Sequence, residues 1–486
     1  MRAGVFAKRA GTNLFLGRYD TAMADALESR TGEASDWKAY FTAGRAAYGL
    51  CEYQTCRKHL ESALELKPDA SGPKKELARC LVRLEEEEQG KFDFQTMFAS
   101  LNPQHVHLDC ASFLSNTRVA SSKLHGNGLF VTRDIKAGEL VFAEKAMFMP
   151  NQYEPRRASA ALYATMVHQL YENPSLADTL LRLYDGGYDR SGLEGTIVDG
   201  VPIVDVFVVE GIRTKNCFSA PLSTFEDTKP GTPAGRFAKG LWAHSSYMNH
   251  SCVPNTLRSF LGDMLISRAT RDIAKGEEIF QQYVPVKALP EVRLKQYQEG
   301  WGFECQCRLC EGEKLSPAAA KAKRKEVLAA VEKACLKKRP GKGLVPESSI
   351  RNIERMMRQL EDLHEPHIYD SLPRLTLIFP TNYLIEAHQG RKNHAKVVRY
   401  ARKLLRNFGF EAPDGDENEA WDPMSIYGKS EMVRLMTIHV VTSLRHLHGA
   451  YKALGELDMA KRCDEAARFG YGMITGFESD VNKLDE

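Results

Sequence analysis

Three cysteines that could bind a metal ion stand close together in the sequence. They are Cys305, Cys307 and Cys310, in the run Cys-Gln-Cys-Arg-Leu-Cys. Zn2+ binds thiolate sulfur, and a structural zinc site takes four ligands in a tetrahedron. The sequence therefore predicts a structural zinc site whose fourth ligand comes from another part of the chain. Buried free thiols are the alternative, whereas a redox role is disfavoured because no isolated Cys-x-x-Cys stands on a thioredoxin-like unit.

A second candidate for chemistry is a polar turn earlier in the chain. It reads Asn249-His250-Ser251-Cys252-Val253-Pro254-Asn255. Asn249 and His250 supply hydrogen-bond donors and acceptors in a small space, and Pro254 fixes φ and favours a sharp turn. The pattern predicts that Asn249 and His250 contact a ligand. The alternative is a polar turn that satisfies only its own backbone.

Two further segments could approach the same ligand. Gly126-Asn127-Gly128 opens a β-like run. Glycine there would let the backbone come close to a ligand, although an ordinary hairpin turn needs it equally. The run from Arg268 to Tyr283 has the pattern of a strand, a turn and a second strand. Taken alone, Tyr283 could be an aromatic side chain that closes a core strand.

Taken together, these segments resemble the SET-domain protein lysine methyltransferases, and most of all the SMYD-like branch that carries an inserted MYND zinc module. Asn-His-Ser-Cys-x-Pro-Asn is a highly specific signature, whereas Gly-x-Gly alone is a weak one. The resemblance implies S-adenosylmethionine as the cofactor, Tyr283 as the catalytic residue and Cys252 as the fourth ligand of a structural zinc ion. The cofactor-binding residues that it implies are Gly126, Asn127, Gly128, Asn216, Ser246, Asn249, His250, Tyr283, Trp301 and Phe303.

The same resemblance implies a fold and includes one departure. In the family, the stretch before Asn-His-Ser-Cys and the stretch that bears the tyrosine thread into a pseudoknot, which is a rare topology. Between Gly128 and Asn216 this chain has no cysteine and histidine array, so the MYND module is absent. Residues 150–210 are instead expected to form a helical and β insertion. Substrate selection in MYND-bearing relatives is therefore a poor guide to this chain.

The expected reaction is transfer of a methyl group from S-adenosylmethionine to a lysine side chain of a protein, whether histone or non-histone. An in-line displacement depends mostly on alignment, and it needs a neutral amine, although the pKa of lysine is about 10.4. Two alternatives remain open. One is a catalytically weak SET scaffold with helical arms, and the other is a zinc-dependent adaptor for protein interactions.

Helical elements flank this central region on both sides. In residues 1–100, Tyr19 recurs as Tyr53, and Ala10 recurs as Gly44 and then Ala78, at a spacing of 34 residues. This period resembles tetratricopeptide repeats, which implies a groove for a peptide or protein partner. The alternative is a plain helical bundle. From residue 313 to residue 486 helical periodicity again dominates, with a tetratricopeptide-like pair near the end.

The fold class expected is α+β and multidomain. A β-rich SET domain is expected at residues 115–285, followed by a zinc-binding post-SET segment at residues 286–312. Glycine turns separate β-like runs between residues 118 and 150, and further β-like runs are predicted at Val204–Val209 and Met264–Ile266. Helical spacing is predicted between residues 158 and 186.

Composition limits the other classes of function. The 486 residues carry a formal net charge of +3 with a pI near 8.2, so bulk charge makes direct nucleic-acid binding unexpected. No apolar stretch is long enough for a membrane span, and none forms the core of a signal peptide. Eleven cysteines, an odd number, fit a reducing compartment with one metal site. We therefore expect an intracellular protein of the cytoplasm, the nucleus or both.

Overall fold

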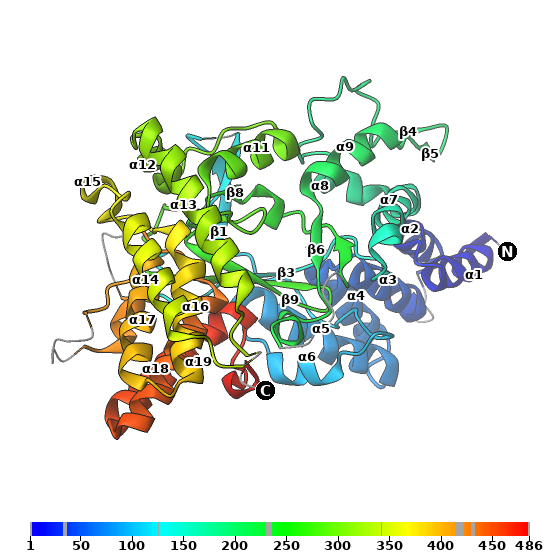
Figure 1. Cartoon of the computed structure of the whole chain (residues 1–486). Helices are drawn as coiled ribbons and strands as arrows, with labels where there is room; N and C mark the ends of the chain where they lie inside the picture. The colour runs from blue at the N-terminus through cyan, green and yellow to red at the C-terminus, as the bar shows by residue number, and fades with distance from the viewer. Residues whose placement is uncertain are drawn as a thin grey trace.

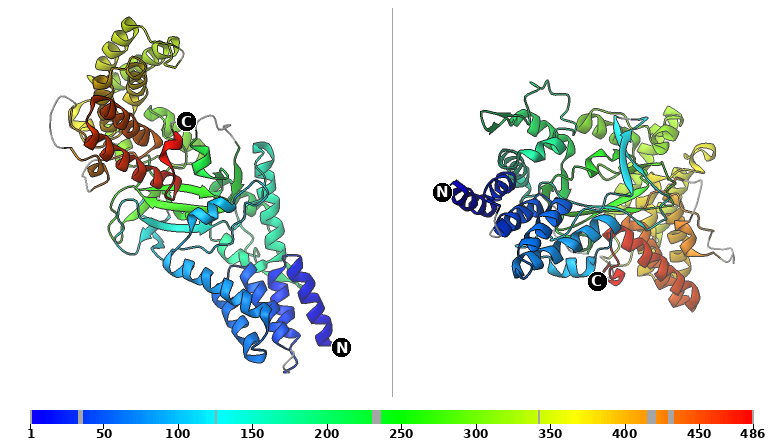
Figure 2. Two further views of the ribbon diagram at one scale, coloured as in Figure 1. Left: turned by 90° about the horizontal axis from the view of Figure 1, so that it is seen from below. Right: turned by 180° about the vertical axis from the view of Figure 1, so that it is seen from behind.

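The structure is a computed structural model that describes residues 2–32, 36–124, 126–229, 236–341, 343–414, 421–428 and 433–484. A β-rich centre lies between two groups of helices (Figure 1). The N-terminal helices and the C-terminal helices extend from opposite sides of that centre, as both views of Figure 2 show. Among the described residues, no helix is both long and apolar enough to cross a lipid bilayer.

The N-terminal arm consists of antiparallel helices. Its elements are α1 (Arg2–Phe15), α2 (Tyr19–Glu28), α3 (Trp37–Gly49), α4 (Tyr53–Leu66), α5 (Ser71–Gln89) and the short α6 (Phe94–Ser100). The spacing of 34 residues has a structural counterpart, because Tyr19 and Tyr53 each begin a helix and Ala10 and Gly44 are both buried. Ala78, however, is exposed on α5. The recurrence at Ala78 therefore has no buried counterpart in the structure.

The β-rich centre contains two main sheets. One has the order β1-β2-β11-β8 and the other the order β3-β10-β9. The strands are β1 (Thr117–Ser121), β2 (Asn127–Val131), β3 (Leu140–Lys145), β8 (Asn249–His250), β9 (Thr256–Leu261), β10 (Met264–Ala269) and β11 (Glu278–Gln281). The predicted β-like runs before residue 150 and at Met264–Ile266 are confirmed. Strand β11 pairs antiparallel with β2 and parallel with β8, so that Gln281 lies opposite His250. This pairing brings three distant segments of the sequence together.

The insertion between β3 and β8 is mostly helical. Its elements are α7 (Pro155–Glu172), η2 (Pro174–Leu176), α8 (Ala177–Leu180), β4 (Ile197–Val198), β5 (Val201–Pro202), α9 (Val206–Asn216), β6 (Phe218–Ala220), α10 (Thr224–Asp227), β7 (Ala238–Gly240) and η3 (Ser245–Tyr247). The strand predicted at Val204–Val209 is wrong, because α9 begins at Val206. The Asp205 carboxylate caps this helix by accepting hydrogen bonds from the backbone N–H groups of Phe207 and Val208. The cap and the burial of Val208 outweigh the strand preference of β-branched residues.

The C-terminal helices share a hydrophobic core with the β-rich centre. They follow α11 (Pro290–Trp301) and α12 (Arg308–Lys314) and comprise α13 (Ala318–Lys337), α14 (Glu347–Glu361), α15 (Pro366–Tyr369), η4 (Leu375–Leu377), α16 (Ile378–Gly390), α17 (His394–Asn407), η5 (Pro423–Tyr427), α18 (Ile438–Leu454), α19 (Leu457–Thr475) and η6 (Val481–Leu484). One continuous cluster of buried side chains runs from these helices to Ile266 on β10 and Cys252 after β8. The all-helical region predicted at residues 313–486 is therefore present, but its core is not separate.

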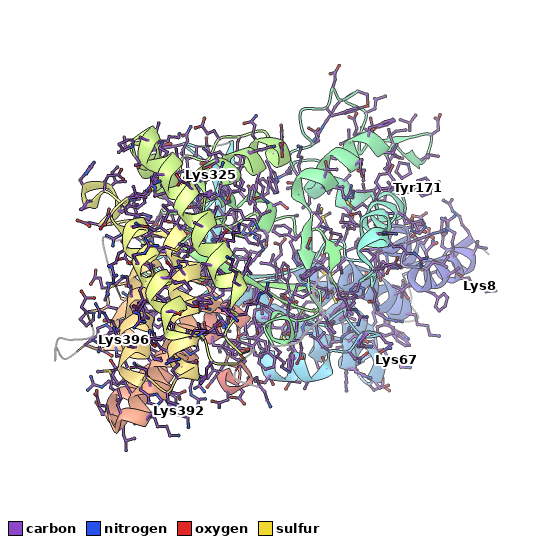
Figure 3. All side chains as sticks on the ribbon, viewed as in Figure 1. Lys8, Lys67, Tyr171, Lys325, Lys392 and Lys396 are labelled. Carbon is purple, nitrogen blue, oxygen red and sulfur yellow. The ribbon has the colours of Figure 1, made fainter. Side chains whose placement is uncertain are left out.

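Charged side chains are spread over both helical groups. Lys8 and Lys67 on the N-terminal arm and Lys325 and Lys392 on the C-terminal helices are exposed on the outside of the molecule (Figure 3). Exposed cations therefore lie on both groups of helices.

Candidate active site

A cavity of about 810 Å³ lies where β2, β8 and the end of β11 meet the insertion and α11. Nine of the ten residues predicted to bind a cofactor line this cavity: Gly126, Asn127, Asn216, Ser246, Asn249, His250, Tyr283, Trp301 and Phe303. They come from five separate segments of the chain. The structure therefore brings together the residues that the sequence singled out, with one exception.

Gly128 is the exception, because it is buried behind the cavity rather than on its wall. A Cβ atom at this position would lie 2.2 Å from Glu278 Oε1 and 3.1 Å from Asn249 Nδ2. Glycine is needed here because two polar side chains approach the backbone of β2 closely. Gly128 is therefore not among the residues that line the cavity, and its predicted contact with a cofactor stays a prediction.

Glu278 on β11 takes part in hydrogen bonds that connect β2, β8 and β11 around the cavity. Asn249 Nδ2 donates hydrogen bonds to Glu278 Oε1 at 2.8 Å and to the backbone oxygen of Asn127 at 3.1 Å. Ser122 Oγ donates to the other oxygen of Glu278 at 2.9 Å. The side-chain amide of Asn249 thus holds β2 against β8 and β11. Glu278 lies in the Arg268–Tyr283 run, but nothing in the sequence distinguishes it from Glu277.

The imidazole of His250 links the cavity to the cysteine cluster. Its Nδ1 accepts a hydrogen bond from the backbone N–H of Tyr283 at 3.2 Å, and its Nε2 lies 3.5 Å from Cys252 Sγ. Burial lowers the pKa of His250, which keeps the ring neutral near physiological pH. With Nδ1 as acceptor, the proton of the neutral ring is on Nε2 and points to the sulfur. Both ring nitrogens therefore have partners within the protein, so the face of the imidazole ring is the part that can contact a ligand in the cavity.

Tyr283 lies on the cavity wall with its hydroxyl held in place. Its Oη donates a hydrogen bond to the backbone oxygen of Met248 at 3.1 Å. Burial raises the pKa of Tyr283 to about 12, so the phenol is neutral near physiological pH. The Tyr283 ring centroid lies 5.1 Å from that of Trp301 and 6.2 Å from that of Phe303. These rings form an aromatic wall that could contact a cationic group.

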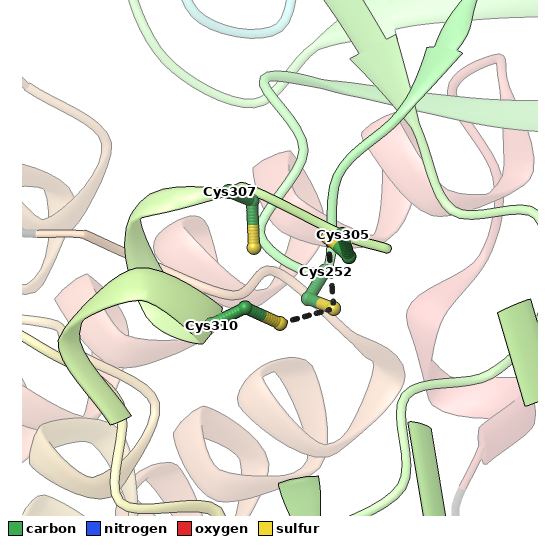
Figure 4. A group of neighbouring side chains, drawn as sticks. All are labelled: Cys252, Cys305, Cys307 and Cys310. Carbon is green, nitrogen blue, oxygen red and sulfur yellow. Dashed lines mark hydrogen bonds between the residues drawn. The ribbon is translucent and has the colours of Figure 1, made fainter. Parts of the chain in front are cut away.

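Four cysteine side chains point toward one another near His250 (Figure 4). Cys252, Cys305, Cys307 and Cys310 have their Sγ atoms all within 4.8 Å of one another. Cys252 Sγ is 3.6 Å from Cys310 Sγ and 3.9 Å from Cys305 Sγ. Tetrahedral Zn2+ with bonds of about 2.3 Å places its sulfurs roughly 3.8 Å apart, so the four positions fit a zinc ion. Cys252, far from the other three in sequence, is therefore suitably placed as the fourth ligand.

A buried cation lies against the cysteine cluster. Arg293 on α11 is fully buried and forms an ion pair with Glu313 on α12. It also donates hydrogen bonds to the backbone oxygens of Lys287 and Ala288. Arg293 also interacts with Cys310, so it would face the net negative charge that four thiolates around one Zn2+ would carry. Nothing in the sequence singled out this residue.

The insertion supplies a wall of the cavity that the sequence did not predict. Arg182, Tyr184, Asp185, Tyr188 and Arg190 all line it. The Asp185 carboxylate accepts a hydrogen bond from Arg190 Nε at 2.6 Å and others from the N–H groups of the loop that follows it. The only local signal in the sequence is a glycine turn, which does not indicate where the loop packs.

A second, larger hollow of about 970 Å³ lies on the other side of the cysteine cluster. It is bounded by Cys307, by Pro254 and by Phe410 and Met436 of the C-terminal region. Of the ten predicted cofactor-binding residues, only His250 reaches it. The smaller cavity is therefore the candidate active site.

Comparison with known proteins agrees with this geometry. The sequence profile of the family described as the SET domain matches residues 126–284, and this stretch contains the glycine turn, the polar turn and Tyr283. Residues 126–284 form a SET domain. The four-cysteine cluster is completed by the segment that follows the SET domain.

Relatives extend the similarity beyond the SET domain. A protein named "Methyltransferase" from Gibberella zeae is 30% identical over 438 residues, which cover 84% of this chain and 58% of that protein. "Protein-lysine N-methyltransferase SMYD4" of Mus musculus is 40% identical over 87 residues, covering 18% of this chain and 11% of that protein. "Histone-lysine N-methyltransferase SMYD3" of Homo sapiens is 42% identical over 72 residues, covering 15% of this chain and 17% of that protein. The chain thus spans less than two thirds of the length of each.

Proposed function

We propose that this protein is a protein-lysine N-methyltransferase that uses S-adenosylmethionine. One observation carries the proposal: Tyr283, Asn249, Trp301 and Phe303 surround one cavity in a SET domain, with four cysteines clustered behind it. The names of the SMYD relatives point to lysine in a protein as the acceptor. The cofactor supplies an electrophilic methyl group on a cationic sulfonium, which a neutral amine displaces in line.

The residues of the cavity would align the two reactants. Tyr283 presents a neutral phenol whose position is fixed by Met248, and the backbone oxygen of Met248 can accept a second hydrogen bond from the acceptor amine. Trp301 and Phe303 offer aromatic faces to cationic groups. The acceptor lysine must lose its proton to water before attack, since only the neutral amine has a free lone pair.

We also propose that the four cysteines hold a structural zinc ion. Such an ion would tie the turn after β8 to the segment at 305–310, and so would hold Trp301 and Phe303 over the cavity. The distances between the sulfurs and the burial of Cys252, Cys305 and Cys310 support this assignment.

The test is incubation of the purified protein with a labelled methyl donor and cell extract, followed by identification of any labelled protein. We expect Tyr283→Phe to lower turnover about tenfold or more, because the hydroxyl is lost, while the affinity for the donor stays nearly constant. Tyr171→Phe is the matched control, since Tyr171 is exposed on the outer side of α7 (Figure 3). Equal turnover in Tyr283→Phe would remove this residue from its role. Donor binding without any labelled product would favour a scaffold instead.

A further inference from the structure

Arg258 on β9 contacts the segment that bears Tyr283. Its Nη1 donates a hydrogen bond to Gln281 Oε1 at 2.6 Å and another to the backbone oxygen of Gln282. Its guanidinium also lies over the ring of Phe218, 5.5 Å from the ring centroid. Arg258 does not line the candidate active site. It therefore acts on the site only through the residues that it touches.

The peptide group that joins Gln282 to Tyr283 is held at both of its polar atoms. Arg258 donates to its oxygen, and its N–H, which belongs to Tyr283, donates to His250 Nδ1 at 3.2 Å. The Tyr283 hydroxyl is fixed separately by Met248. Rotation of this peptide plane would break both hydrogen bonds. The two bonds therefore fix the direction in which the Tyr283 side chain leaves the backbone.

The contacts of Arg258 are with neutral groups. Among the residues that the structure describes, Arg258 forms no ion pair; its partners are two glutamine oxygens and an aromatic ring. Removal from solvent lowers the pKa of Arg258 to about 10, so that it remains a cation near physiological pH. A charged donor strengthens the hydrogen bond to the Gln282 oxygen.

Tyr283 has charges of both signs near it. Glu278 on β11 is an acid whose two oxygens accept hydrogen bonds from the neutral groups of Asn249 and Ser122, and its negative charge opposes that of Arg258 at Tyr283. Arg258 therefore acts on Tyr283 through its hydrogen bond to the backbone and not through a net positive field.

We infer that Arg258 is a positioning residue of the methyl-transfer site, which orients Tyr283 through the backbone oxygen of Gln282. This inference rests on the proposed function. Because Arg258 does not line the cavity, its loss should impair the alignment of Tyr283 and leave the binding of the methyl donor nearly unchanged.

Three variants test this role. Arg258→Lys, Arg258→Met and Arg258→Gln all lose the guanidinium contact with Gln282, and only the first keeps the positive charge. Arg118→Met is the matched control, because Arg118 is exposed on β1 and also lies over a phenylalanine ring, that of Phe130 at 5.8 Å. The dissociation constants of S-adenosylmethionine and S-adenosylhomocysteine are measured by calorimetry, and kcat is measured at saturating concentrations of both substrates.

In all three variants we expect kcat to fall about tenfold because Tyr283 is aligned less well, while the dissociation constants of both ligands stay within about twofold of the wild type. Arg118→Met should match the wild type in both measurements. Wild-type turnover in all three variants would overturn the positioning role. Ligand binding that weakens as much as turnover would show a general structural role and would also overturn it.

The same measurements distinguish this inference from the proposed function. Wild-type protein that binds neither ligand would overturn the proposed function, and the role of Arg258 with it. Wild-type protein that binds both ligands and methylates lysine, with neutral variants that behave like Arg118→Met, would overturn only the role of Arg258. Arg258→Met and Arg258→Gln differ in polarity, so that if one of them fails to fold the other can still be measured.

Discussion

Helices α1–α5 and helices α13–α19 flank the same SET domain, but they are joined to it in different ways. The C-terminal helices share one continuous apolar core with Ile266, Cys252, Cys305 and Cys310. Helices α1–α5 instead bury their apolar side chains in two small clusters, whose one buried member from outside these helices is Ala111 among the described residues. Segments that share an apolar core tend to unfold together, whereas segments with separate cores can unfold independently. The C-terminal helices and the cysteine cluster should therefore unfold as one unit, while the arm can open separately.

Polar contacts make part of the connection on the N-terminal side. Asn173, at the end of α7, is fully buried, and its Oδ1 accepts a hydrogen bond from the backbone N–H of Tyr19 at 2.6 Å. Arg18 pairs with Glu172 at 3.0 Å. Hydrogen bonds are directional and specify an orientation, but each contributes only about 1 kcal/mol to stability. These hydrogen bonds therefore fix the orientation of the arm but contribute little to the free energy that holds it in place.

Loss of a cysteine ligand is expected to give the largest effect. Cys310→Ser, or removal of zinc by a chelator, should cost on the order of 5 kcal/mol, since binding of a structural zinc ion contributes directly to folding. Hydrogen exchange should accelerate in the SET domain around Cys252 and through α13–α19, while α1–α5 keep their protection. Cys51→Ser is the control, because Cys51 is exposed outside this cluster. Equal acceleration in α1–α5 would show that the comparison between the two groups of helices is wrong.

The next largest effect is expected at Phe477, which joins three parts of the chain. Its ring centroid lies 5.6 Å from that of Phe98 on α6 and 6.3 Å from that of Phe225 on α10. Phe477 is 3% exposed, and Phe477→Ala should lower the free energy of unfolding by about 3–5 kcal/mol. Urea unfolding measures this loss. Phe15→Ala on the arm, where the ring is 89% exposed, should cost less than about 0.5 kcal/mol, and a similar cost for both would contradict the apolar connection.

Much of the site could be predicted from the sequence because many of its residues occur in short, contiguous motifs. The Asn249–Asn255 turn, Tyr283 and the Cys305–Cys310 run each carry several informative residue types in fixed order, and the resemblance supplied their common location. The β-like runs next to them are separated by glycine turns, which made the β-rich centre predictable as well.

The residues that sequence reasoning missed act through contacts between distant segments. Arg258, Glu278 and Arg293 are ordinary charged residues until folding places them beside Gln282, Asn249 and the cysteine cluster. Helix α9 was missed for a related reason, because one capping aspartate and a buried face overrode the strand preference of its valines. Local sequence does not encode such pairings.

The smallest effect should come from the polar connection of the arm. Asn173→Ala removes the acceptor for Tyr19 N–H and the donor to the backbone oxygen of Gly17, and should cost about 1–3 kcal/mol locally because buried polar groups lose their partners. Hydrogen exchange should accelerate around residues 17–20, with methyl-donor binding unchanged. Ser175→Ala, which removes an exposed contact with Asp20, should produce a weaker version of the same change. A loss of donor binding in Asn173→Ala would mean that the arm and the catalytic cavity unfold together, because the arm would then be as integral to the SET domain as the C-terminal helices are.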